Sequence, residues 1–289
     1  MSMQKLQRDL KREARRFRNR NKPPRHRRLL LGLLVGILAL GLFLGHRPIL
    51  EQYYFDRGER AFAAAEHQQA VDSFLLARHH NPDGEKAAAA LLLAADIENL
   101  KLGQFREALR HYLLVIRDYS EHPEAKSALR QAATLSQERL GEPLEALMLW
   151  QMLLTHAISD GDRVQRRIAD CYFRLENFSQ ARIEFESLLL NYPESPLRAL
   201  AQFRIGEIHA IMAEEAEAFQ AMVAVREQWP DSRYAVEAGF SIAKYLERQG
   251  RLQEAEQLLL ELREKADSAL VEQRLKQVRT RIAEKKKAI

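Results

Sequence analysis

The chain has 289 residues, 45 Lys or Arg against 40 Asp or Glu, and a single cysteine. One thiol excludes an intramolecular disulfide framework and a cysteine-based zinc site. The charge is unevenly spread: residues 1–28 hold 12 Lys or Arg and two acids, which leaves 33 bases and 38 acids for the other 261 residues. This mildly acidic remainder argues against a nucleic-acid-binding surface there.

Residues 1–28 form a basic head that we expect to be disordered. Its arginines would lie on anionic lipid headgroups. Contact with RNA is the alternative, but Phe17 is the only aromatic residue available for stacking on bases. The composition therefore favours the lipid surface.

Residues 29–47 are predicted to form one transmembrane helix. Leu29 to Gly45 is a run of 17 residues without a charge, near the lower limit for crossing a bilayer. Because the basic head precedes the run, the positive-inside rule places the N-terminus in the cytoplasm and the rest of the chain in the periplasm, on a bacterial inner membrane. A cleaved signal peptide, cut near Gly41, is the alternative. No cysteine lies near the run, which excludes lipoprotein attachment.

Four glycines in this segment are spaced as two small-x-x-x-small pairs: Gly32 with Gly36, and Gly41 with Gly45. Such pairs let two helices approach closely in lipid, which predicts a weak homodimer through the membrane helix. Glycine is also common in spanning helices that do not associate.

From residue 50 to 267 one short pattern returns six times. An alanine is followed four residues later by a large apolar residue, which is the spacing of one buried helical face. The pairs are Ala70/Phe74, Ala108/Tyr112, Ala146/Trp150, Ala181/Phe185, Ala218/Met222 and Ala255/Leu259, and the alanines are 38, 38, 35, 37 and 37 residues apart. A period in this range predicts a solenoid of stacked two-helix units.

The first helix of each unit should carry a small residue twelve positions before the alanine. Four units do, with Gly58, Ala169, Gly206 and Ala243. Asp96 and Thr134 stand at this position in the second and third units, so the edges of these two units are uncertain. The turns between helices contain Gly103, Gly141 and Gly250, and the second helices end before Pro82, Pro193 and Pro230.

A last helix is predicted over residues 268–289, ending in a basic tail. Its apolar stripe consists of Val271, Leu275, Val278 and Ile282, and its other faces are polar. A terminal element of this kind caps the open end of a solenoid.

These patterns resemble the tetratricopeptide repeat, with a small residue in helix one, then Ala-x-x-x-aromatic and proline. The linkers that begin at Tyr192-Pro193 and Trp229-Pro230 resemble those of the bacterial envelope subgroup, which includes BamD-like and CpoB/YbgF-like repeats. The resemblance implies an all-α fold: a right-handed α-solenoid of about six such helical hairpins and a C-terminal capping helix, preceded by the transmembrane helix.

By the same resemblance, ligand contacts come from first-helix residues that line a concave groove. The candidates in this chain are Phe55, Glu59, Arg166, Asp170, Phe173, Arg174, Phe203, Glu207, Phe240 and Lys244. An aromatic row made of Phe55, Phe203 and Phe240 would hold a segment of a partner. Packing between repeats is the alternative role for these three rings. The Lys and Asn pattern of carboxylate-clamp repeats is absent.

No phosphate-binding loop, nucleophile elbow or metal motif occurs in the sequence, so we expect neither catalysis nor a cofactor or metal. The leading hypothesis is a membrane-anchored periplasmic scaffold that binds other proteins in envelope assembly, protein export or cell division. The alternative is an accessory recruitment module of a polysaccharide or peptidoglycan synthesis complex.

Overall fold

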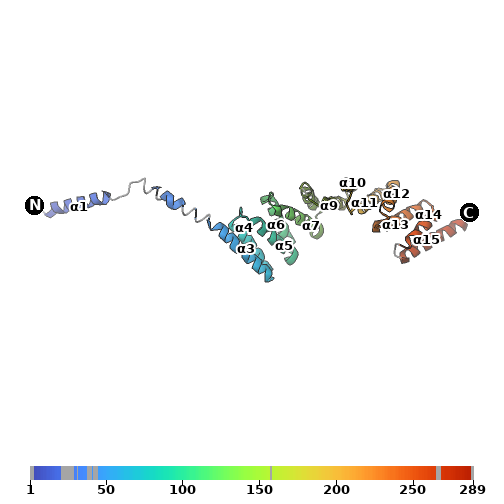
Figure 1. Cartoon of the computed structure of the whole chain (residues 1–289), viewed down its shortest axis with the longest axis horizontal. Coiled ribbons are helices and arrows are strands. Elements are labelled where there is room, and N and C mark those ends of the chain that lie inside the picture. Colours follow the sequence, from blue (N-terminus) through green and yellow to red (C-terminus); the bar gives the residue numbers. More distant parts are fainter. Residues whose placement is uncertain are drawn as a thin grey trace. The chain divides into compact units, whose positions relative to one another are not determined.

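The computed structural model describes residues 3–20, 29–30, 32–37, 41, 45–156, 158–264 and 268–287. All regular secondary structure within these ranges is helical, which confirms the all-α prediction (Figure 1). The chain divides into two compact units, Met1–Leu93 and Ala94–Ile289, with the boundary inside helix α5 (Ala87–Ile97).

Within the basic head, for which the composition predicts disorder, the structure has a helix, α1 (Met3–Arg20). The segment is built almost wholly from good helix formers such as arginine, lysine, glutamine, leucine and alanine. It has neither proline nor glycine to interrupt the backbone ladder.

The apolar segment after the head is described only in part, because residues 31, 38–40 and 42–44 of the predicted membrane helix lie outside the described residues. Among the residues that are described, no helix is both long and apolar enough to cross a membrane. A methyl group added to Gly32, Gly36, Gly41 or Gly45 would meet no atom within 4 Å. Nothing within the described part of this chain therefore requires a small residue at these positions.

The first hairpin pairs α3 (Arg47–Ala63) with α4 (His67–His80) in the N-terminal unit. Gly58 allows close packing, since a Cβ there would lie 2.8 Å from the ring of Phe74. The buried carboxylate of Glu51 accepts hydrogen bonds from Asn81 Nδ2 at 2.6 Å and from the backbone N–H of Lys86 at 2.7 Å. These bonds fasten the chain that leaves α4 back onto α3.

In the C-terminal unit, helices follow one another as a series of hairpins in which sequence neighbours pack together (Figure 1). After α5 come η1 (Glu98–Leu102), α6 (Phe105–Asp118), α7 (Pro123–Leu135), η2 (Ser136–Leu140), α8 (Pro143–Leu154), α9 (Gly161–Arg174), α10 (Phe178–Asn191), α11 (Arg198–Ile211), α12 (Glu215–Gln228), α13 (Arg233–Arg248), α14 (Leu252–Leu262) and α15 (Ser268–Lys287). With α3 and α4 these make six hairpins and one last helix, as the repeat pattern predicts.

All six alanines of the repeat and all six large apolar residues that follow them are buried. The apolar stripe of α15 is buried as well, with Val271, Leu275 and Val278 packed in one core cluster with residues of α13 and α14. Two ion pairs add to this contact, from Arg281 to Glu247 of α13 and from Arg279 to Glu256 of α14. Helix α15 therefore covers the apolar face of the last hairpin, which is the position predicted for a capping helix.

Each hairpin turns through one left-handed residue, placed five positions before the repeat alanine. Glycine occupies this place three times, as the sequence predicts, but the other turns use Ala65, Glu176 and Ala213 at φ of 60°, 57° and 61°. A side chain in this conformation costs roughly 1–2 kcal/mol relative to glycine. Every hairpin therefore has a left-handed residue at this position, and glycine adopts that conformation with the least strain.

The second and third hairpins contain one extra residue in their first helices. It is absorbed by the π-helical segments η1 and η2. The backbone bond that closes the turn spans six residues here, from Gln104 N–H to Glu98 C=O, and five residues elsewhere, as from Asn177 N–H to Tyr172 C=O. A π segment accommodates such an insertion without breaking the helix.

Because of this insertion, the small residue in these two units lies one position earlier than the sequence analysis predicted. Counting one residue further back from the alanine gives Ala95 and Ala133, and both are fully buried. Asp96 and Thr134 are thus the neighbours of the small residue and not its replacements. The two longest spacings between repeat alanines, 38 residues each, have the same cause.

Candidate binding groove

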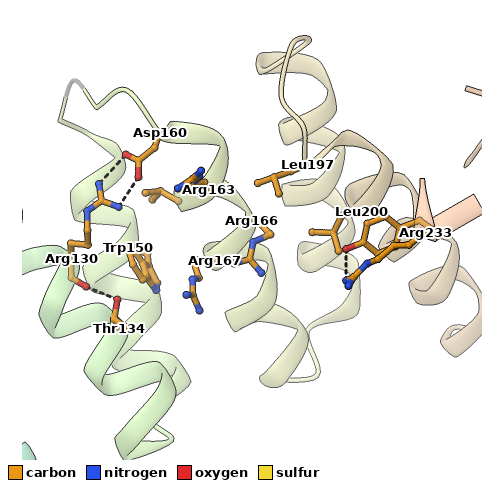
Figure 2. A pocket seen from close by; sticks show the side chains of 12 residues that line it. Arg130, Thr134, Trp150, Asp160, Arg163, Arg166, Arg167, Leu197, Leu200 and Arg233 are labelled. Carbon is orange, nitrogen blue, oxygen red and sulfur yellow. Dashed lines mark hydrogen bonds and ion pairs between the residues drawn. The ribbon is translucent and has the colours of Figure 1, made fainter. Parts of the chain in front are cut away.

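The first helices of the third to sixth hairpins line a hollow of about 610 Å³ that we call the arginine groove. Its walls come from α7, α8, α9, α11 and α13, all within the C-terminal unit (Figure 2). The lining residues are Arg130, Thr134, Trp150, Asp160, Arg163, Val164, Arg166, Arg167, Leu197, Leu200, Arg233 and Tyr234. Five arginines and one aspartate make this surface strongly basic, although the repeat region as a whole is acidic.

Helix α9 supplies three of the arginines because its two faces differ sharply. Ile168, Ala169 and Cys171 are buried. Arg163, Arg166 and Arg167, spaced i, i+3 and i+4, share another face. Figure 2 shows Arg163 and Arg167 on the side of Trp150, and Arg166 towards Leu200.

Three of the groove arginines are held in place by carboxylates. Arg130 binds Asp160 through both terminal nitrogens at 2.8 and 2.9 Å, a bidentate geometry that fixes the guanidinium plane (Figure 2). Arg166 Nη1 lies 2.9 Å from Asp170 Oδ2, and Arg167 Nη1 lies 2.7 Å from Glu138 Oε1. The side chains are thus oriented before any ligand arrives.

Hydrogen bonds to the π segment η2 help to hold α8 and α9 in place. Gln137 accepts a hydrogen bond from Trp150 Nε1 at 3.0 Å through its side chain. The backbone carbonyl of Gln137 accepts a bond from Arg174 Nη1 at 2.7 Å. The Arg174 bond and the Arg167–Glu138 pair tie α9 to the inserted segment of the preceding hairpin, and the Trp150 bond ties α8 to it.

Two groove arginines have no carboxylate partner within the described ranges. Arg163 is exposed near the start of α9, and the exposed Arg233 at the start of α13 donates only to Tyr234 Oη, at 2.7 Å. A guanidinium group has five N–H donors, so most of the donors of both groups are available to a ligand. The groove therefore carries an excess of positive charge that the protein does not neutralise.

Burial raises the pKa of Asp170, while Arg166, Arg204 and Arg167 oppose this shift. Burial likewise raises the pKa of the Cys171 thiol to about 11, so this thiol remains protonated at neutral pH. A protonated, buried thiol is a poor nucleophile. Within the described residues no group of three or more metal-ligating side chains is assembled.

Of the ten candidate residues from the sequence, only Arg166 lines the arginine groove, and Asp170 is bonded to it. Glu207 and Lys244 line a separate hollow of about 290 Å³ between α11, α12 and α13. Arg174 is fixed to η2, as described above. Arg204 connects the candidates Asp170 and Glu207, because its guanidinium nitrogens lie 3.9 Å from an oxygen of the first and 2.9 Å from an oxygen of the second.

The aromatic candidates take part in repeat packing. Phe203 is buried, with its ring centroid 5.7 Å from that of Tyr234, and Phe240 is half-buried against the same core cluster. Phe173 packs on Phe178 at 5.4 Å and lies under the guanidinium group of Arg204. In the N-terminal unit Phe55 is buried against Phe74 at 5.4 Å, and Glu59 is exposed. Little of Phe55 or Phe203 is accessible to a partner.

Sequence reasoning missed Arg130, Arg163, Arg167 and Arg233. One signal was available: once the inserted residue of the third hairpin is counted, Arg130 occupies the repeat position of Arg166. Trp150 was assigned to the core, and it is indeed buried, but its edge also reaches the groove.

Residues 164–195, which span most of α9 and all of α10, match the family model of the tetratricopeptide repeat. No curated protein matches the chain. The solved structures that resemble it include a MamA protein (17% identity, TM-score 0.51, 63% of this chain and 93% of that one) and a tetratricopeptide repeat protein from Parabacteroides merdae (17%, 0.49, 75% and 80%). YrrB, described as having an unusual peptide-binding site, is also similar (17%, 0.48, 64% and 89%). At such low identity these likenesses show the fold alone.

Proposed function

We propose that this protein is a non-catalytic scaffold that binds other proteins through the first-helix surface of its repeats. The observation that carries the proposal is the arginine groove, a continuous surface to which four successive hairpins contribute. Solenoids of stacked helix pairs use such extended surfaces for binding. Tetratricopeptide repeats mediate protein–protein interactions, and the family match falls on α9 and α10, the helices of the hairpin that supplies most of the arginines.

We further propose that residues 29–47 anchor the scaffold in a bacterial inner membrane, with the head in the cytoplasm and the repeats in the periplasm. The uncharged run from Leu29 to Gly45 and the 12 basic residues before it support this orientation. A role in envelope assembly, export or cell division would follow from that location.

Site-specific photocrosslinking in cells tests the binding surface. A photoreactive residue at Leu200, in the groove, is compared with one at Leu190, which is 81% exposed on the second helix of the fourth hairpin. We expect a distinct protein to be captured from position 200 and not from position 190. Capture of no protein at position 200, or of the same set at both positions, would contradict the proposal. Capture of a glycan-synthesis enzyme would select the recruitment role instead.

Membrane anchoring is tested separately. The protein should stay with the membrane fraction after an alkaline wash, and its N-terminal sequence should be the intact head. A mature chain that begins after residue 41 would show that the segment is a cleaved signal, and the anchor would then be excluded.

A further inference from the structure

We propose that the arginine groove binds an acidic, extended segment of a partner protein, with Arg163 and Arg233 as the groups that recognise its carboxylates. The inference rests on the proposed scaffold function and names the chemistry of its partner.

Positive charge is concentrated in the groove. Elsewhere on the C-terminal unit, several surface arginines are neutralised by nearby glutamates, among them Arg226 by Glu261, Arg248 by Glu215, Arg263 by Glu272 and Arg279 by Glu256. In the groove, Arg163 and Arg233 have no such partner within the described residues. What distinguishes these two arginines is that they share one hollow with three further arginines, and such a concentration of positive charge is complementary to an anionic ligand.

The two unpaired arginines come from hairpins that are not adjacent. Arg163 belongs to the fourth hairpin and Arg233 to the sixth, and α11 of the fifth hairpin contributes Leu197 and Leu200 to the surface they share (Figure 2). An extended chain with several carboxylates can engage arginines from these two non-adjacent hairpins at once.

Part of the groove lining is apolar. Leu197 and Leu200 are half-buried and offer carbon surface among the guanidinium groups, whereas Trp150 is buried and only its edge reaches the groove. A peptide with apolar side chains between its acids would bury this surface, whereas a phosphate group would not. Nucleic acid is disfavoured because the region outside the head is net negative, with 38 acids against 33 bases.

The paired arginines have a supporting role in this scheme. Arg130, Arg166 and Arg167 are held by Asp160, Asp170 and Glu138, so they shape the groove before binding. A preformed surface reduces the entropy lost when a flexible segment is ordered. Recognition then depends on the two arginines that are not paired.

The test uses the full-length protein in a zwitterionic detergent and a fluorescein-labelled peptide in which glutamates and aspartates surround two leucines. Fluorescence anisotropy measures its affinity for wild type, for Arg163→Gln/Arg233→Gln, and for the matched control Arg248→Gln/Arg279→Gln. Both double variants remove the same charge from the same unit, and circular dichroism verifies that each is folded.

We expect the groove variant to bind at least about tenfold more weakly, since it loses charge-assisted hydrogen bonds, and the control to change by less than about threefold. Affinity should fall as salt is added. An equal loss in both variants would overturn the proposal, and so would equally tight binding of a peptide with lysines in place of the acids. So would a single-stranded oligonucleotide that outcompetes the peptide in the groove.

Failure of this inference is distinguishable from failure of the proposed function. If position 200 captures a protein in cells but the acidic peptide does not bind, the scaffold function stands and the assignment of an acidic ligand is wrong.

Discussion

The second and third hairpins differ from the fourth to sixth in how the first helix ends. The second and third end in a π segment with one extra residue, and the fourth to sixth end in ordinary α-helix. The π segments carry polar side chains into the interior, where Glu98 binds His111 and Gln137 binds Trp150. The insertion thus replaces part of an apolar interface by a hydrogen-bonded one, and in the third hairpin that interface supports the arginine groove.

The largest effect should come from His111→Leu in the second hairpin. His111 Nδ1 lies 2.7 Å from Glu98 Oε2, with the two side chains only 7% and 4% exposed. Removing one partner of such a buried pair costs about 3–5 kcal/mol. Hydrogen exchange of the α6 amides measures the loss locally, which suits a repeat protein whose unfolding need not be two-state.

The double variant His111→Leu/Glu98→Leu is the control for this effect, because no polar group is then left without a partner, and most of the stability should return. Arg248→Leu breaks an exposed pair in the sixth hairpin and should cost at most about 1 kcal/mol. If the single and double variants are equally unstable, lost packing rather than the unpaired carboxylate is responsible.

The register of the insertion is tested by Ala133→Met and Thr134→Met. Ala133 is fully buried, so the larger side chain should overpack the third hairpin and cost about 1–3 kcal/mol. Thr134 is half-buried at the edge of the groove, where methionine should cost less than about 1 kcal/mol. Thermal unfolding compares the two. If Thr134→Met were the more destabilising variant, Thr134 would be the packing position at the regular twelve-residue spacing, and the proposed one-residue insertion would be wrong.

Tyr112→Phe removes the hydroxyl that donates to Asp96 Oδ1 at 2.6 Å. Burial raises the pKa of Asp96, and the Tyr112 hydrogen bond partly lowers it. The carboxyl group of Asp96 therefore binds its proton more tightly in the folded state than in the unfolded state. For this reason its contribution to the free energy of unfolding falls as the pH rises through the range just above the ordinary pKa of aspartate. The variant should lose about 1–3 kcal/mol at neutral pH, where the carboxylate is left without its donor.

The loss should be smaller near pH 4, because Asp96 is then largely protonated in the folded state; an unperturbed aspartate titrates at about 3.9. Urea unfolding at both pH values provides the comparison, with Tyr245→Phe of the sixth hairpin as control. An identical loss at both pH values would mean that the hydroxyl acts on stability without acting on Asp96.

The smallest effect concerns the left-handed turns that both groups of hairpins share. Gly141→Ala in the third hairpin should cost about 1 kcal/mol through backbone strain alone, since no atom lies within 4 Å of the added methyl. Ala213→Gly in the fifth should relieve the same strain, less the entropy that glycine adds to the unfolded chain. Opposite signs in calorimetric Tm are expected. A destabilising Ala213→Gly would show that the strain at Ala213 is smaller than the entropy that glycine adds to the unfolded chain.

The sequence predicted the fold well because the repeat is local. An alanine and a large residue four positions later determine which helical face is buried. Because six copies occur in register, the pattern can be recognised without knowledge of any long-range contact. The site was predicted poorly. Phe203 and Phe240 share a repeat position with Phe55, but whether such a ring lies in a groove or between helices depends on the neighbouring hairpin, as the contact of Phe203 with Tyr234 shows.

By itself, then, the sequence determined six hairpins, the capping helix, the uneven charge of head and repeats, and an uncharged run long enough to suggest an anchor. Only the tertiary structure decided that one inserted residue becomes a π segment, that Ala95 and Ala133 are the packing positions, and that arginines from three hairpins meet. Helical periodicity is encoded within a few residues of chain. The convergence of Arg130, Arg163 and Arg233, which are far apart in sequence, depends on how one hairpin stacks on the next.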